Sequence, residues 1–195
     1  SYSRFTPAPW LELSNDITYV VIEEGVTSIG LRAFSFCRNL TSVTIPSSIN
    51  SICNGAFSGC SSLTSVEIPD SVTSIGSSAF SGCSSLTYNI YGNAKYLGND
   101  KNPYVALVET ISDSITFCNL HENIKIIGDA VFSGCDGLMG IWANENNAVY
   151  SSDERGVLFN KDKTKLIQAP GAITGSYVVP GGVTSIVDRA FYDCS

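Results

Sequence analysis

The stretch from Leu63 to Ser85 reads LTSVEIPDSVTSIGSSAFSGCSS, and the two stretches before it follow the same pattern. Ile17 to Asn39 reads ITYVVIEEGVTSIGLRAFSFCRN, and Leu40 to Ser62 reads LTSVTIPSSINSICNGAFSGCSS, so the three units follow one another without a gap. Phenylalanine and cysteine recur every 23 residues, at Phe34, Phe57 and Phe80 and at Cys37, Cys60 and Cys83. A fixed period of this length marks a solenoid of stacked coils.

Each unit supplies apolar side chains at positions that suit the inside of a coil. In the third unit we expect seven residues to point inward: Leu63, Val66, Ile68, Val72, Ile75, Ala79 and Phe80. Pro69 ends the strand that carries the first three, and Gly76 lies at a bend. One unit buries too little apolar surface to offset the entropy of ordering its chain, so stability has to come from stacking.

The period of 23 residues predicts a leucine-rich-repeat solenoid, because such repeats span roughly 20 to 29 residues. We expect a right-handed β/α-type superhelix with a parallel β-sheet on one face and short helical or 3-10 turns on the other. Two inserted β-hairpins are also predicted, because strand-like runs there flank clusters of turn-forming residues. Their strands are expected at 94–98 and 104–111, and at 157–159 and 166–167. Either hairpin is decoration or carries a binding site, and the structural role is favoured.

The same pattern gives a domain organisation. Residues 1–16 are expected to be an irregular or capping segment, and residues 17–195 a single leucine-rich-repeat domain. Its predicted parts are regular repeats at 17–39, 40–62 and 63–85, an insertion at 87–114, a repeat at 115–137, an irregular coil and hairpin at 138–172, and a partial last repeat at 173–195.

Residues 63–85 closely resemble the BspA-like leucine-rich-repeat family, whose pattern is roughly L-x-x-I-x-I-P-x-x-V-x-x-I-G-x-x-A-F-x-x-C-x-x. The resemblance extends over most of the chain from Ile17 onward, and its AF-x-x-C ending is specific. It implies a secreted or cell-surface protein of the kind common in gut and oral bacteria and in some mucosal protists. Adhesion to host extracellular-matrix proteins is known for some members. The family has no shared catalytic residues to transfer.

Composition excludes several classes of partner. The net charge is −7 and the basic residues do not cluster, so we expect no binding to nucleic acid. No apolar run approaches the roughly 20 residues of a membrane helix. The chain begins at Ser1, its only methionine is Met139, and it stops just after the fifth AF-x-x-C motif. We therefore expect a fragment of a longer extracellular or cell-surface protein, without its signal peptide.

The seven cysteines are interpreted as structural. Five occupy the same place in successive coils, at Cys37, Cys60, Cys83, Cys135 and Cys194, and are predicted to form a ladder of free buried thiols. Neighbouring coils bring them close enough that disulfides stay an open alternative. Cys53 and Cys118 occupy other repeat positions and are expected to be ordinary core residues.

Nothing in the sequence predicts an active site, so we expect no enzyme, no cofactor and no bound metal. The single histidine, His121, takes the place of Pro46 or Pro69 in the repeat and is interpreted as a surface turn residue. Paired zinc-ligand cysteines, nucleophile motifs and phosphate-binding loops are all missing from the sequence. The acidic stretches lack the ligand spacing of an EF-hand calcium loop.

Binding is the remaining possibility, and strand residues that alternate with the buried ones should face outward. By register these are Tyr19, Val21, Ser42, Thr44, Ser65, Glu67, Phe117, Asn119, Gly140, Trp142, Ser176 and Val178. The residues predicted to meet a partner are Tyr19, Ser42, Thr44, Ser65, Glu67, Phe117, Asn119 and Trp142. Outward aromatic residues are typical binding anchors. The alternative is that the hairpins cover Phe117 and Trp142.

The leading hypothesis is a non-catalytic module that binds a protein or glycan, such as host extracellular matrix, in adhesion or host interaction. The rival hypothesis is a structural spacer that presents another domain at the cell surface.

Overall fold

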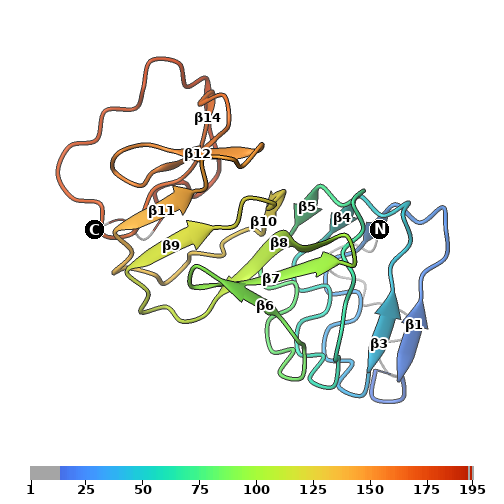
Figure 1. The fold of residues 1–195 in the computed structure, drawn as a ribbon. Helices are drawn as coiled ribbons and strands as arrows, with labels where there is room; N and C mark the ends of the chain where they lie inside the picture. The colour runs from blue at the N-terminus through green and yellow to red at the C-terminus, as the bar shows by residue number, and fades with distance from the viewer. Residues whose placement is uncertain (1–13, 193, 195) are drawn as a thin grey trace. The chain divides into compact units, whose positions relative to one another are not determined.

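The computed structural model describes residues 14–192 and 194, and the predicted capping segment therefore lies almost wholly outside the described residues. The described residues form strands β1 to β15 (Figure 1). The chain divides into two compact units. Unit 1 comprises Ser1–Asn89, Tyr96–Val108 and Ile126–Val131, and unit 2 comprises Ile90–Lys95, Glu109–Lys125 and Phe132–Ser195.

Unit 1 contains two parallel ladders whose rungs are 23 residues apart. In the first, β1 (Tyr19–Val21) pairs with β3 (Ser42–Thr44), and an isolated bridge continues the ladder from Ser42 to Ser65. In the second, β4 (Ser51–Ile52) lies between β2 (Ser28–Ile29) and β5 (Ser74–Ile75). Each coil therefore meets its neighbour along two short strands, where a single sheet face was predicted.

The predicted helical or 3-10 turns are wrong for this part of the chain: residues 14–192 and 194 contain no helix. At 31–37 the backbone N–H groups alternate in direction. Those of Arg32, Phe34 and Phe36 donate to carbonyls of the next coil at 2.7–3.0 Å. The intervening N–H groups, beginning with Ala33, donate to the carbonyl three residues back. In a helix every N–H donates to a carbonyl of the same helix, so alternate donation to a neighbouring coil excludes a helix at these residues.

The core of unit 1 lies between the ladders and these turns. All seven residues of the third repeat that were predicted to point inward are buried, with exposed fractions of 0–7%. The Phe57 ring is fully buried and stacks on Phe34 and Phe80, with ring centroids 5.4 and 5.5 Å apart. One aromatic column therefore runs through three successive coils.

The cysteine ladder has its own hydrogen bonds. All seven cysteines are free thiols, five of them buried, and Cys53 and Cys194 are only partly buried. The Sγ of Cys60 donates to the carbonyl of Phe34 at 3.0 Å, and the Sγ of Cys83 to that of Phe57 at 3.2 Å. Burial raises the pKa of the Cys60 thiol to about 12, so this side chain is a neutral donor.

Serine and threonine explain how a surface with few charges remains ordered. The hydroxyls of Thr41, Thr64 and Thr73 each donate to a backbone carbonyl 23 residues earlier, at 2.8–3.2 Å. Ser84 does the same at 3.3 Å. These hydroxyls add a second hydrogen bond to carbonyls that already accept a backbone N–H from the next coil, so much of the polar composition serves the stacking.

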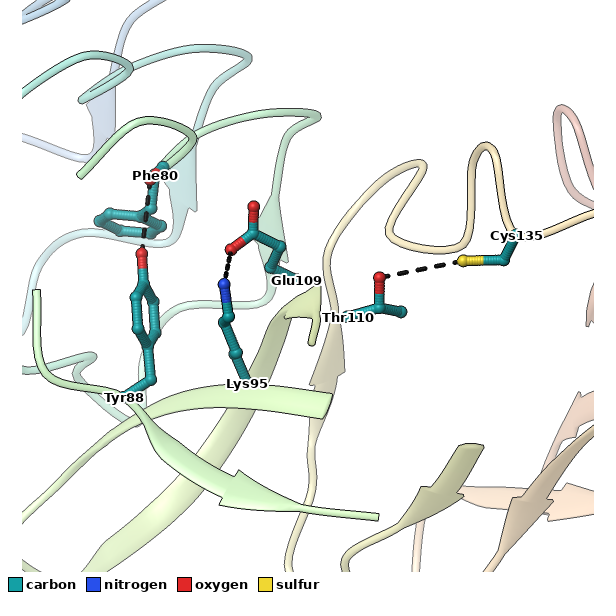
Figure 2. A network of polar contacts seen from close by, with 6 residues as sticks. All are labelled: Phe80, Tyr88, Lys95, Glu109, Thr110 and Cys135. Carbon is teal, nitrogen blue, oxygen red and sulfur yellow. Dashed lines mark hydrogen bonds and ion pairs between the residues drawn. The ribbon is translucent and has the colours of Figure 1, made fainter. Parts of the chain in front are cut away.

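The segment after the third repeat forms a sheet with strand order β10-β8-β7-β6. The strands are β6 (Asn89–Tyr91), β7 (Ala94–Asn99), β8 (Asn102–Thr110) and β10 (Ile126–Ile127). Figure 2 shows polar contacts of this segment. Lys95 Nζ and Glu109 Oε2 form an ion pair at 2.6 Å, and the Tyr88 hydroxyl donates to the Phe80 carbonyl at 3.5 Å. Thr110 Oγ1 lies 3.8 Å from Cys135 Sγ.

In unit 2, β9 (Phe117–Leu120) pairs in parallel with β11 (Gly140–Ala143). A second sheet has the order β12-β13-β14-β15, with strands β12 (Tyr150–Ser152), β13 (Leu158–Asn160), β14 (Lys165–Gln168) and β15 (Ser185–Ile186). β13 is antiparallel to both of its neighbours, whereas β14 and β15 are parallel. Antiparallel strands thus occur where the second hairpin was predicted. That this hairpin, or the one at 94–111, is an insertion into a coil stays a prediction.

Candidate functional site

The outward positions of unit 1 form a mainly small, polar surface. The predicted residues Tyr19, Ser42, Thr44, Ser65 and Glu67 are all exposed. Tyr19 lies opposite Ser42 in the register, and Ser42 is bridged to Ser65, so the structure brings these three together. Tyr19 is 70% exposed and its neighbour on the same face, Val21, is 60% exposed. Beyond Tyr19 and Val21, the outward positions of this ladder carry the hydroxyl groups of Ser42, Thr44 and Ser65 and the carboxylate of Glu67.

The outward face of β9 and β11 in unit 2 has a different character. Phe117 and Trp142 are 46% and 39% exposed, so neither ring is buried beneath another segment. Asn119 is exposed and lies directly opposite Trp142 in the parallel register. All three predicted residues of this face therefore lie on two paired strands. The alternative that the hairpins bury Phe117 and Trp142 is wrong.

Gly140 was predicted to face outward, but it is buried. A Cβ atom at Gly140 would lie 2.7 Å from Cε2 of Trp142, so the indole rests on the glycine backbone. The indole thus fills the place where a side chain of residue 140 would stand. Because Gly140 pairs with Phe117, this position draws the Trp142 ring toward the Phe117 backbone.

A further chain segment on the other side of β9 adds residues that sequence reasoning missed. The N–H of Asn119 donates to the Gly92 carbonyl at 3.0 Å, and Asn93 Nδ2 donates to the Phe117 carbonyl at 2.9 Å. Next to them, the Tyr91 ring meets the His121 ring edge-on, with centroids 4.9 Å apart. The regular 23-residue spacing is interrupted between Phe80 and Phe132, so nothing in the sequence indicated that Tyr91 lies beside β9.

We call Tyr91, Phe117, Asn119, His121 and Trp142 the aromatic strip. The chain after β9 is held rigidly by Asn147, whose side chain is completely buried. Asn147 Nδ2 donates to the carbonyls of His121, Glu122 and Ile124 at 2.7–3.3 Å. Its Oδ1 accepts the N–H groups of Val149 and Tyr150 at 2.8 and 2.6 Å. A strip anchored in this way is preorganised, which lowers the entropic cost of binding.

The chemistry of the strip is that of recognition. Its rings offer faces for stacking, and Asn119 adds an amide donor and acceptor. His121 Nδ1 accepts the N–H of Asn123 at 3.1 Å, so this histidine participates in its own turn, as predicted for a surface turn residue. Across the described ranges, no group of three or more histidine, cysteine, aspartate or glutamate side chains is placed to hold a metal ion.

One polar cluster elsewhere in unit 2 has a structural role. The Tyr177 hydroxyl donates to Asp153 Oδ2 at 2.6 Å, and the Arg155 guanidinium donates to the carbonyls of Thr174 and Ser176 at 2.7 and 2.9 Å. Burial and the bond to Asp153 raise the pKa of Tyr177. These contacts fasten the loop around residue 176. The predicted outward strand at Ser176 and Val178 is therefore wrong: both residues are exposed, but they lie in this loop.

Comparison with known proteins gives the family. A model described as the BspA type leucine-rich repeat region matches residues 12–101 and 108–167, in 6 copies. The chain belongs to this family. The BspA-type match also includes most of the segment predicted as an insertion. No curated protein matches the sequence significantly.

Solved structures similar to this BspA-type chain are leucine-rich-repeat proteins of bacteria. A leucine-rich repeat protein from Eubacterium ventriosum aligns over 100% of this chain and 50% of its own, with 24% identity and a TM-score of 0.50. A leucine rich cell surface protein from Faecalibacterium prausnitzii aligns over 90% and 51%, with 26% identity and a TM-score of 0.39. The chain thus spans about half the length of these structures. The first likeness supports the leucine-rich-repeat β-solenoid fold.

For residues 14–192 and 194, the structure contains no helix with the length and apolar character needed to cross a membrane.

Proposed function

We propose that this chain is a non-catalytic binding module of a secreted or cell-surface protein, and that the aromatic strip is where its protein or glycan partner binds. The observation that carries the proposal is the exposure of Phe117 and Trp142 on two paired strands. Aromatic side chains with an open face and a fixed backbone are the groups that contribute most to binding energy in interfaces. Several exposed aromatic residues on one face are more informative than a single exposed apolar residue, because such patches are typical of binding sites.

The arrangement of the strip supports recognition of an extended partner. Tyr91, Phe117 and Trp142 come from three chain segments that lie next to one another, with the Asn119 side chain on the middle one. The Tyr91 ring meets His121 toward one end of β9, and the Trp142 ring lies over Gly140, which pairs with Phe117 toward the other end, so the exposed rings form a row along this face. A peptide or a glycan chain lying across such a row would meet several rings and an amide at once. Membership of the BspA-type family, with its surface-exposed and adhesive members, supports the same proposal.

The test is a binding panel on the immobilised chain, with extracellular-matrix proteins, mucins and purified glycans as probes. We expect at least one probe to bind the wild-type chain and to lose roughly tenfold or more in affinity with Phe117→Ala or Trp142→Ala. Tyr19→Ala is the matched control, because Tyr19 is an exposed aromatic residue on the outward ladder of unit 1. Binding that survives both strip substitutions and is lost with Tyr19→Ala would contradict the proposal.

A structural spacer is the second candidate, and the polar surface of unit 1 favours it. The hydroxyls of Thr41, Thr64 and Thr73 donate to the neighbouring coil, which makes them part of the stacking. A repeat array of this kind can hold another domain at a distance without any ligand. Uniform absence of binding across the panel, together with a separate domain in the full-length protein, would favour the spacer over the binding module.

A further inference from the structure

The first coil differs from its neighbours on the turns that were predicted to be helical. It has Leu31, Arg32 and Phe36, whereas the second coil has Asn54, Gly55 and Gly59 at the same positions. Leu31 and Phe36 are 40% and 57% exposed, so the larger side chains add surface and little core. Stacking alone does not need large residues at these positions, since the second coil does without them.

Phe36 also occupies a backbone position that disfavours it. Its φ angle is 61°, in the left-handed region, where Gly59 and Gly82 of the next two coils have φ angles of 76° and 75°. Bulky residues seldom adopt this conformation, and strained positions of this kind concentrate at functional sites. An exposed phenylalanine here is unfavourable for the isolated fold, which points to a role in contact with something else.

The Phe36 ring is held in a fixed position. A Cβ atom added to Gly59 would lie 2.6 Å from Cδ1 of Phe36, so the ring lies directly on the backbone of the second coil. Its other face is open to solvent, as the exposed fraction of 57% requires. The ring thereby forms a flat apolar platform at the border between two coils.

A groove of about 700 Å³ runs beside this platform across three coils. We call it the turn groove, and its lining includes Leu31, Arg32, Phe36, Asn54, Ser58 and Ser77. The volume lies within the range of about 300–1,000 Å³ found for sites that hold small molecules. All of these residues belong to unit 1.

Several polar side-chain groups of the turn groove are not used by the fold. Unlike Thr41 and Thr64, the Ser58 and Ser77 hydroxyls make no hydrogen bond to any other described residue. Asn54 Oδ1 accepts the Ser77 N–H at 3.2 Å, which leaves the amide hydrogens of Asn54 for a ligand. The Arg32 guanidinium is exposed and has no carboxylate partner among residues 14–192 and 194.

These groups define the chemistry of the ligand. Guanidinium is a fork of donors that matches a carboxylate in bidentate geometry. Hydroxyl and amide groups pair with the hydroxyls of a sugar, and the negative face of an aromatic ring attracts polarised C–H groups such as those of a sugar ring. We infer that the turn groove is a second binding site, which takes a sugar that bears a carboxylate. Its residues are separate from the aromatic strip, so the inference goes beyond the proposed function.

Calorimetric titration of the whole chain tests this, with 3′-sialyllactose and a hyaluronan tetrasaccharide as the two sources of a sugar carboxylate. Lactose is the neutral probe and a triglutamate peptide is the carboxylate without a sugar. We expect one or both acidic sugars to bind about tenfold more tightly than lactose or the peptide. Arg32→Gln should reduce that affinity to the level of lactose. Phe36→Gly, which introduces the residue found at this position in the next two coils, should weaken the binding of every sugar.

Two controls make the outcome decisive. Arg38→Gln removes another exposed arginine of the same coil, and Tyr192→Ala removes an exposed aromatic residue that belongs neither to the turn groove nor to the aromatic strip; both should leave binding of the acidic sugars unchanged. Equal binding of lactose and the acidic sugars, no binding of any sugar, preferential binding of the peptide, or loss of binding with Tyr192→Ala would each overturn the inference. Circular dichroism melts should show no loss of stability for Arg32→Gln or Phe36→Gly, since both side chains are exposed and glycine adopts the positive φ angle at position 36 without strain.

Discussion

Replacing Phe57 by alanine perturbs the stacked column that joins the first three coils. The Phe57 ring is completely buried, and it stacks on the rings of Phe34 and Phe80 with interplanar angles of 12° and 10°. A buried phenylalanine-to-alanine change costs about 3–5 kcal/mol, from lost transfer energy and from the cavity that remains. Because the ring stacks on two others, we expect the loss to lie in the upper part of this range, at about 4–5 kcal/mol.

The assay is urea denaturation followed by circular dichroism, together with thermal melting. At about 2–4 °C per kcal/mol for a chain of this size, Phe57→Ala should lower the melting temperature of the transition that reports unit 1 by roughly 8–20 °C. Phe36→Ala is the matched control, because its ring is 57% exposed and lies one residue before Cys37 on the equivalent turn. It should change the unfolding free energy by less than about 1 kcal/mol. Similar small losses in both variants would refute the stacked-column account.

Other consequences follow from the same contacts. Asn147→Ala should lower the unfolding free energy of unit 2 by about 2–4 kcal/mol, because buried carbonyls and N–H groups that bind Asn147 lose their partner. In a urea titration, a loss below about 0.5 kcal/mol, which is typical of surface substitutions, would contradict this. Burial raises the pKa of Cys60 and of Cys118 from 9.0 to about 12, so the neutral thiols stabilise the fold fully below pH 9 and this contribution is lost as the pH rises toward 12. Denaturation midpoints should therefore fall across that window, and Cys60→Ala should flatten the fall; an unchanged slope would count against it. Thiol titration at neutral pH should find the buried cysteines unreactive in the folded chain and all seven reactive in denaturant without reductant; detection of disulfides would refute the free-thiol ladder.

The inward-facing residues could be predicted from the sequence because the 23-residue repeat places them at fixed positions within each unit. Val66 and Ile68 are buried and alternate with the exposed Ser65 and Glu67, and the same spacing recurs in the preceding coils. Such a pattern specifies which side chains are buried together, and hence which ones are left outside. Phe117, Asn119 and Trp142 were found in this way, as the alternating positions of β9 and β11.

The turns could not be predicted from one repeat, because their hydrogen bonds depend on the next coil. The sequence around Arg32 and Phe36 is compatible with a helical turn, but both residues adopt positive φ angles and donate to carbonyls of the second coil. Their conformation is set by a partner 22 residues away, which no local propensity encodes. Gly140 is a similar case. Its outward position in the strand register was predicted, but the Trp142 indole lies over it and buries it.

Tyr91 was not predicted, for a different reason. It lies where the regular 23-residue spacing is interrupted, between Phe80 and Phe132, so no register connected it to β9. Only the bonds of the adjacent residues Gly92 and Asn93 to that strand bring Tyr91 to the His121 ring. A site that combines regular strands with an irregular segment can therefore be predicted only in part from the sequence.

Hydrogen–deuterium exchange in the presence of the strongest-binding probe from the panel tests the central claim most directly. The aromatic strip predicts slower exchange at residues 90–93, 117–121 and 140–143 when the probe is bound, with the coils at 17–85 unchanged or altered only around the turn groove. Protection confined to the outward ladder of unit 1, with residues 117–121 and 140–143 unaffected, would contradict the account.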